Sequence, residues 1–131
     1  MILMDTCAII WDALEPDKLS NKAMSAIKKA DKSNALIISD ISIWEISMLI
    51  KKKRLEVDTT AANFINLFLQ SRSVSVQAIS PEIAELSVSF GADINNDPAD
   101  RIIAATSIIV NAQLVTADQN LIDSPMINTV W

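Results

Sequence analysis

The sequence of 131 residues is most informative in the residue types that it lacks. It contains no histidine, which excludes a histidine general base, Ser-His-Asp and Cys-His centres, and His-ligated zinc. Cys7 is the only cysteine, so neither an internal disulfide nor a cysteine-rich metal site can form. Gly91 is the only glycine, which excludes both the GxGxxG dinucleotide-binding turn and the P-loop. Any chemistry must therefore depend on carboxylates, hydroxyls, amines or a metal ion.

Long apolar runs are also missing. No segment approaches the roughly 20 apolar residues that are needed to span a bilayer. The first apolar run ends at Asp5, which makes it too short for a signal peptide. We therefore expect a cytoplasmic protein without a membrane partner. The length and the ordinary charged fraction favour a single globular domain over residues 1–131.

The net charge of −5 argues mildly against a broad nucleic-acid-binding face. Acids that cluster around a bound cation also contribute to this net negative charge, although the occupied site is not anionic. The clearest basic run is Lys51–Arg54. Such a run at a helix end is more often a solvated face than a binding site, and the alternative is that it holds RNA backbone.

Apolar segments typical of strands alternate along the chain with segments typical of helices. The expected strands are 2–4, 35–39, 74–79, 113–116 and 126–130, of which 74–79 alternates and is placed nearer an edge. The expected helices are 7–14, 20–30, 42–53, 59–71, 80–91 and 97–112. This alternation predicts an α/β three-layer sandwich with a mainly parallel central sheet.

Several apolar side chains are expected in the core. Trp44 shares an apolar face with Met48 and Leu49, and Leu67 belongs to the wide apolar stripe of the 59–71 helix. Cys7 and Trp11 are also most simply explained as core residues.

The segment beginning at Asp97 has the features of a helix start. Asp97 can act as the N-cap, and Pro98 occupies the first helical position, where a missing N–H costs nothing. Asp100 lies three residues after Asp97, so both carboxylates stand at the same helix end. Asp97 is better explained as a cap than as a ligand, and Asp100 as a ligand rather than a cap.

Four acids lie near the carboxyl ends of the expected parallel strands, where open sheets bind their ligands. Asp5 ends the first strand, Glu45 follows the second, Asp118 follows the 113–116 strand, and Asp100 stands at the start of the helix that leads into that strand. Converging carboxylates repel one another unless a cation is present. Oxygen-only ligands select Mg²⁺ or Mn²⁺, and such an ion can activate water against a phosphodiester.

Some of these residues also have ordinary structural explanations. Glu45 can be the capping-box partner of Ser42, and Asp118 can cap a helix. Thr116 can be a plain strand residue. Arg101 can contact a phosphate or form an ion pair with a nearby acid.

Four segments in order resemble the PIN domain family, in particular the VapC-type toxin ribonucleases. The segments are Met4-Asp5-Thr6, Ser42-Ile43-Trp44-Glu45-Ile46, Asp97-Pro98-Ala99-Asp100-Arg101-Ile102-Ile103-Ala104-Ala105 and Val115-Thr116-Ala117-Asp118. The resemblance implies that Asp5, Glu45, Asp100 and Asp118 are the metal-binding acids and that Thr6 is the hydroxyl residue beside the first.

The same resemblance implies RNA cleavage that depends on Mg²⁺ or Mn²⁺, a homodimer, and inhibition by a cognate antitoxin protein. One departure is visible, because many relatives carry His shortly before the Asp-Pro, where this chain has Asn95 and Asn96.

Two other classes of protein are considered. The first is a non-catalytic PIN-like module that binds RNA or a protein, and the presence of all four acids speaks against it. The second is an aspartyl-phosphate enzyme or receiver domain. A phosphatase of that class needs a second acid two residues after the nucleophile, where this chain has Cys7, and no lysine follows a late strand as a receiver requires.

Overall fold

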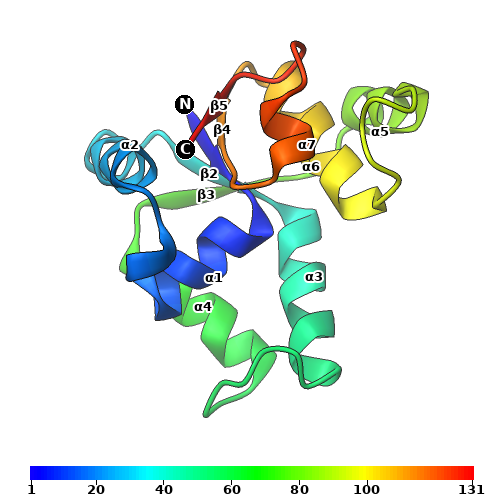
Figure 1. Cartoon of the computed structure of the whole chain (residues 1–131). Helices are drawn as coiled ribbons and strands as arrows, with labels where there is room; N and C mark the ends of the chain where they lie inside the picture. The colour runs from blue at the N-terminus through cyan, green and yellow to red at the C-terminus, as the bar shows by residue number, and fades with distance from the viewer.

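The computed structural model describes all 131 residues, and at its centre is a parallel sheet (Figure 1). The strand order is β3-β2-β1-β4-β5, and every neighbouring pair is parallel. The strands are β1 (Ile2–Met4), β2 (Leu36–Ser39), β3 (Val74–Gln77), β4 (Gln113–Val115) and β5 (Thr129–Val130). The predicted position of the 74–79 segment at an edge is confirmed, because β3 is the outermost strand on its side.

Helices cover both faces of this sheet, so the predicted three-layer α/β sandwich is confirmed (Figure 1). The helices are α1 (Thr6–Leu14), the 3₁₀ turn η1 (Pro16–Lys18), α2 (Asn21–Lys32), α3 (Asp40–Lys51), α4 (Ala61–Ser71), α5 (Pro81–Ser89), α6 (Pro98–Ile109) and α7 (Gln119–Ile122). None of them has the length and apolar character needed to cross a membrane.

Alternation along the short strands divides the core into two clusters. Met4 and Val115 pack into the cluster that α1, α2, α3 and α4 share, whereas Leu3 and Leu114 pack into the cluster of α5, α6 and α7. Successive side chains of a strand point to opposite faces, and a sheet covered on both faces needs apolar residues at every position. This is why the strands appear in the sequence as continuous apolar runs.

Polar side chains fix where the helices begin. Thr60 caps α4 by accepting the N–H of Asn63 at 3.1 Å, and Asp97 caps α6 by accepting the N–H of Ala99 at 2.9 Å. The Asp97 cap was predicted from the sequence. Each of the two caps satisfies a backbone donor that a helix cannot pair within its first turn.

The predicted start of α3 is wrong. Ser39 is its N-cap and accepts the N–H of Ile41 at 3.2 Å, so the helix begins at Asp40. Ser42 lies inside the helix, fully buried, and its hydroxyl is hydrogen-bonded to that of Thr6 at 2.9 Å. Ser42 therefore connects α3 to α1, and the capping box that would have explained Glu45 does not exist.

Three expected core side chains are on the surface. Trp44 is 57 % exposed and Leu67 is 58 % exposed, and Cys7 is exposed as well. On α3 the buried line consists of Ser42 and Ile46, which turns Trp44 outward. Trp11 is half-buried and packs against Trp131, with ring centroids 5.7 Å apart.

The end of the chain also differs from the prediction. The last strand is only Thr129–Val130, whereas a strand over 126–130 was expected. The N–H of Ile127 bonds instead to the carbonyl of Ser124 at 3.3 Å, which makes a turn of the residues before the strand. Pro16 begins the 3₁₀ turn η1, which lies between the expected helices 7–14 and 20–30.

Candidate metal centre

The carboxyl end of the central strand β1, between β2 and β4, is a common place for a ligand in an open parallel sheet. β1 pairs with β2 on one side and β4 on the other, which creates a crevice at their carboxyl ends. Asp5 directly follows β1, and its N–H donates to the carbonyl of Val115 at 3.1 Å. Asp118 follows β4 at the same edge. Two acids from opposite ends of the sequence therefore meet at this crevice.

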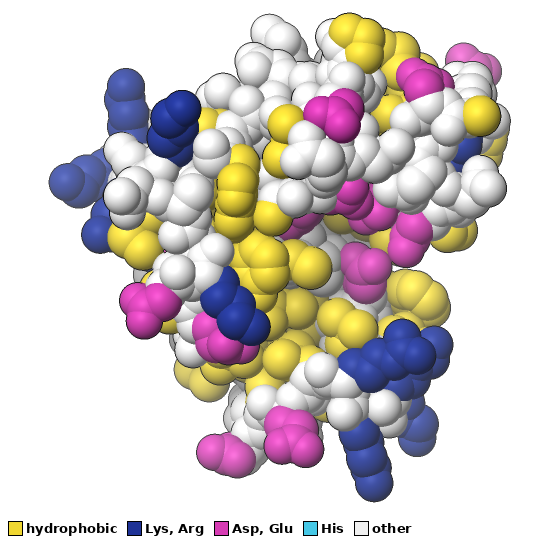
Figure 2. All heavy atoms as spheres, in the orientation of Figure 1, with side chains coloured by type: hydrophobic (Ala, Val, Ile, Leu, Met, Phe, Trp, Pro, Cys, Tyr) yellow, Lys and Arg dark blue, Asp and Glu magenta, His cyan; other side chains and the backbone are white.

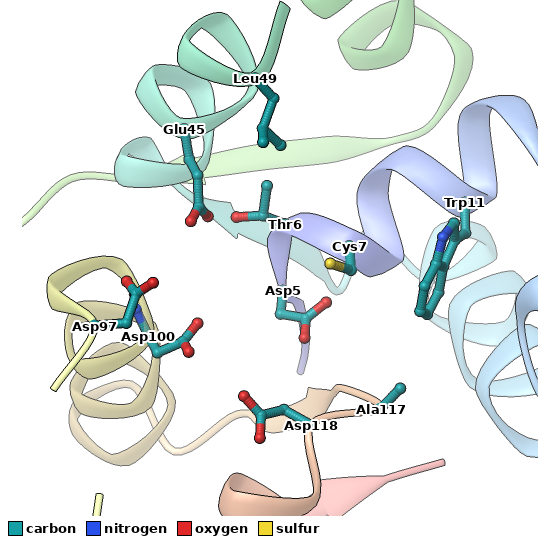
Figure 3. Close-up of a pocket in the computed structure, with 10 residues that line it drawn as sticks. All are labelled: Asp5, Thr6, Cys7, Trp11, Glu45, Leu49, Asp97, Asp100, Ala117 and Asp118. Carbon is teal, nitrogen blue, oxygen red and sulfur yellow. The ribbon is translucent and has the colours of Figure 1, made fainter. Parts of the chain in front are cut away.

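A cavity of about 450 Å³ opens at this edge, and its wall is rich in acids. Its acidic lining residues are Asp5, Glu45, Asp97, Asp100 and Asp118. Figure 3 shows their carboxylates around one space, with the residue between β1 and α1, the helix α3, the start of α6 and the loop after β4 each contributing. The structure thus places the four predicted metal ligands in a single cavity and adds Asp97.

Asp5 and Asp118 are held in place because each also caps a helix. The Oδ1 of Asp5 accepts the N–H of Ala8 at 2.8 Å, and the Oδ1 of Asp118 accepts the N–H of Asn120 at 2.9 Å. The hydroxyl of Thr116, itself buried, accepts the N–H of Asp118 at 3.1 Å. Capping and lining the cavity are therefore compatible, because the cap uses one carboxylate oxygen.

Asp100 is oriented by Asn95, a residue to which the sequence analysis assigned no role in the site. The side-chain amide of Asn95 donates to Oδ2 of Asp100 at 3.0 Å. Asn95 is itself fixed by Asn120, whose Oδ1 accepts the backbone N–H of Asn95 at 3.0 Å. The only signal in the sequence was that asparagine stands near the position where relatives carry histidine. The amide supplies a neutral donor to the carboxylate.

The side chain of Arg101 binds the backbone between α5 and α6. Its guanidinium donates to the backbone carbonyls of Phe90, Gly91, Ile94 and Asn95 at 2.8–3.1 Å, and it forms no ion pair. The segment between α5 and α6 has no strand partner, so its carbonyls need donors. Four hydrogen bonds from the guanidinium meet that need, and the ion pair that was one of the two roles considered for Arg101 does not form.

Burial and mutual repulsion disturb the ionisation of these carboxyl groups. Burial is the main cause that raises the pKa of Asp5 to about 6, and the charges of Asp118 and Glu45 add to it. Burial likewise raises the pKa of Asp100 to about 6, with contributions from Asp97 and Asp118. The pKa of Glu45 is also raised, by burial first and then by Asp97. The cavity therefore disfavours its own negative charge.

Cys7 lies in the wall of the same cavity but does not supply a nucleophile. Although part of the residue is exposed, desolvation of the thiol in this wall, and then the four surrounding carboxylates, raise the pKa of Cys7 to about 11. The thiol is therefore protonated at neutral pH, and it is the thiolate that attacks electrophiles.

The donors in the cavity fit a hard divalent cation. Carboxylate oxygens are the preferred ligands of Mg²⁺ and Mn²⁺, and no imidazole is present to favour softer metals. No three acidic or cysteine side chains stand close enough together to hold an ion directly. The carboxylates instead line an open space with room for water molecules, which Mg²⁺ retains when it binds proteins.

Comparison with known proteins agrees with this architecture. The PIN domain model matches residues 2–124, which is nearly the whole chain. The chain belongs to the PIN domain family. Ribonuclease VapC22 of Mycobacterium tuberculosis is 31% identical over 132 residues, covering 99% of this chain and 98% of that protein. The sequence resemblance to VapC-type PIN domains is thereby confirmed, and the receiver-domain alternative is excluded.

Solved structures show that the fold of this PIN domain is shared. VapBC2 from Rickettsia felis, bound to a DNA fragment from its promoter, gives a TM-score of 0.74 at 18% identity, over 98% of this chain and 97% of the other. DNA-bound VapBC from Salmonella typhimurium gives 0.72 at 14% identity, over 98% and 95%. At these identities the likeness concerns the fold alone.

Proposed function

We propose that this PIN domain is an endoribonuclease that depends on Mg²⁺ or Mn²⁺ and serves as the toxin of a toxin–antitoxin pair. The observation that carries the proposal is the convergence of Asp5, Glu45, Asp100 and Asp118 on one cavity at the carboxyl ends of the strands. Support for RNA as the substrate comes from the name of the relative in Mycobacterium tuberculosis, a ribonuclease. The absence of histidine leaves these carboxylates as the available ligand set.

In this proposal Asp5, Glu45, Asp100 and Asp118 would hold the ion, in part through water molecules that it retains. When bound, the ion lowers the pKa of a coordinated water and offsets charge on the phosphoryl oxygens. The chain supplies the fixed framework: two of the acids are anchored as helix caps, and Asn95 orients Asp100. Asp97 adds negative charge to the cavity and is not one of the proposed ligands.

The hydroxyl of Thr6 has a supporting role. It is buried, bonded to Ser42, and placed where it lowers the pKa of Glu45 against the larger effect of burial. A hydroxyl can accept a hydrogen bond from Ser42 while donating to a carboxylate. Thr6 therefore favours the charged form of Glu45, which is the form that binds a cation.

Partners are inferred from the relatives. VapBC from Salmonella typhimurium and a toxin–antitoxin complex from Klebsiella pneumoniae are among the proteins with this fold. We infer that this chain binds a cognate antitoxin protein. We also propose a homodimer, on the resemblance to VapC-type toxins alone.

The test is cleavage of a panel of RNAs, with Mg²⁺ and with EDTA. We expect the parent to cut only with the metal, and Asp5→Asn and Asp100→Asn to lose cleavage while keeping the fold. Asp58→Asn, an exposed acid in the segment after α3, is the matched control and should cut like the parent. If Asp5→Asn and Asp100→Asn both cut at the parental rate, the carboxylates do not form the active site. If the parent binds RNA without cutting it, the non-catalytic module is correct.

A further inference from the structure

A second hollow of about 350 Å³ lies directly beside the acidic cavity, between α3 and the start of α6. We call it the side groove. Besides Ile41, the residues that line only this groove are Trp44, Met48, Lys52, Arg54, Pro98 and Ala99. Glu45, Leu49 and Asp97 line both hollows. A chain lying in the side groove would therefore lead straight into the acidic cavity.

Trp44 presents an unusually large aromatic surface to this groove. It is 57 % exposed, and it lies one residue before Glu45 on the same helix. Trp44, Met48 and Lys52 are spaced four residues apart, so they form one stripe that runs along α3 to its C-cap, Lys52. An aromatic face and a cation thus line the same wall of the groove, with Met48 between them.

The basic end of the groove has an ordered backbone. The N–H of Arg54 bonds to the carbonyl of Leu49 at 2.9 Å, and the N–H of Lys53 bonds to that of Ile50 at 3.1 Å. Lys53 has a φ of 57°. These are the features of a Schellman turn, which closes a helix and fixes the direction of the chain after it. Lys52 and Arg54 are therefore displayed from a defined turn.

These cations have no partner within the chain. The three ion pairs involve Lys18 and Arg72, and none involves the run Lys51–Arg54. All four residues of the run are exposed. Figure 2 shows Lys and Arg side chains gathered over the end of α3, close to the hollow that contains acidic side chains. This positive surface is thus available beside a cavity that repels phosphate.

We propose that the side groove holds the single-stranded RNA that flanks the cleaved phosphodiester, with one base stacked on Trp44 and the backbone phosphates against Lys52 and Arg54. This inference rests on the proposed ribonuclease function and adds the place where the substrate is held. Proteins bind single strands by combining aromatic stacking platforms with cations along the backbone. The cations offset the repulsion that the acidic cavity exerts on the RNA, so substrate binding and metal binding are divided between adjacent surfaces.

The test measures kcat and KM for a fluorescent single-stranded RNA of about ten nucleotides, a length within the usual single-strand site size. Trp44→Ala should raise KM by about tenfold or more, with a much smaller change in kcat, because stacking on one base is lost. Trp44→Phe should restore most of the loss. The double variant Lys52→Ala and Arg54→Ala should flatten the dependence of log KM on log salt by about 1.4, since two phosphate contacts disappear.

Matched controls lie on other faces of the molecule. Leu67→Ala removes an apolar side chain that is 58 % exposed on α4, and Lys28→Ala with Lys32→Ala removes two exposed cations from α2. Both controls should leave KM and its salt dependence unchanged.

The outcomes separate the two proposals. A parent that does not cut RNA refutes the ribonuclease function and this inference with it. A parent that cuts normally while Trp44→Ala keeps the parental KM overturns this inference alone. If Trp44→Ala instead breaks a dimer in sedimentation with KM unchanged, the groove is an interface between copies of the chain and the inference is wrong.

Discussion

Replacing Asp5 by asparagine should stabilise the metal-free protein while it removes the proposed activity. Asp5 is 9% exposed, and its pKa rises from 3.8 to about 6 on folding, mainly through burial. Folding therefore carries the cost of burying this charge at neutral pH. Asparagine is as good an N-cap as aspartate, so the bond from the N–H of Ala8 should survive.

The magnitude follows from the two pKa values. When folding raises the pKa of a carboxyl group, the group contributes its full stabilisation below the unfolded pKa, where it is protonated in both states. This stabilisation decreases as pH rises from the unfolded pKa through the folded pKa, and it is absent above both values. For Asp5 the loss above the higher pKa corresponds to about 3 kcal/mol. The advantage of Asp5→Asn should therefore be about 3 kcal/mol at pH 8 and about half of that at pH 5.

The assay is urea unfolding followed by circular dichroism at both pH values, in the presence of EDTA. Asp58→Asn is the control, because an exposed acid away from the cavity should change the free energy of unfolding by less than about 0.5 kcal/mol. A variant no more stable than the parent at pH 8, or an advantage that does not grow between pH 5 and pH 8, would refute the reasoning. Adding Mn²⁺ should then stabilise the parent and not the variant.

Three further predictions concern stability and the framework of the cavity. Lys53→Gly should raise the free energy of unfolding by about 0.5–1 kcal/mol in urea melts, because Lys53 has a φ of 57° that glycine adopts without strain; an unchanged or lower value would contradict this. Arg72→Ala should cost about 2–4 kcal/mol in the same melts, because it leaves the carboxylate of Asp12, only 6% exposed, without the guanidinium that binds it at 2.8 Å; a loss under about 0.5 kcal/mol would show that this pair contributes nothing. Arg101→Lys should keep the charge but lose most of the carbonyl contacts, so proteolysis between α5 and α6 should accelerate and RNA cleavage should fall; parental values for both would show that the contacts do not hold this segment.

The fold could be predicted from the sequence because its signals are local. Continuous apolar runs mark strands that are covered on both faces, and Asp97 followed by Pro98 marks the start of α6. Once the strands were recognised as parallel, the rule for their carboxyl ends was enough to bring Asp5 and Asp118 to one edge.

The remaining features depend on contacts between distant segments. Ser42 has the spacing of a capping box, but its hydroxyl is taken by Thr6, 36 residues earlier. For Arg101 a phosphate contact and an ion pair were both considered, yet the carbonyls of an irregular segment accept hydrogen bonds from its nitrogens. The exposure of Trp44 depends on which side of α3 faces α1, and the apolar pattern of a single helix does not determine this.

The most direct measurement is a calorimetric titration of Mn²⁺ into the parent, Asp5→Asn and Asp100→Asn at pH 6.5, repeated in buffers of different ionisation enthalpy. We expect saturable binding to the parent with release of protons, because Asp5 and Asp100 both have a pKa of about 6 and must lose their protons to bind the ion. Both variants should bind much more weakly. A parent that shows no saturable binding, or variants that bind as tightly as the parent, would contradict the claim that these carboxylates hold a divalent cation.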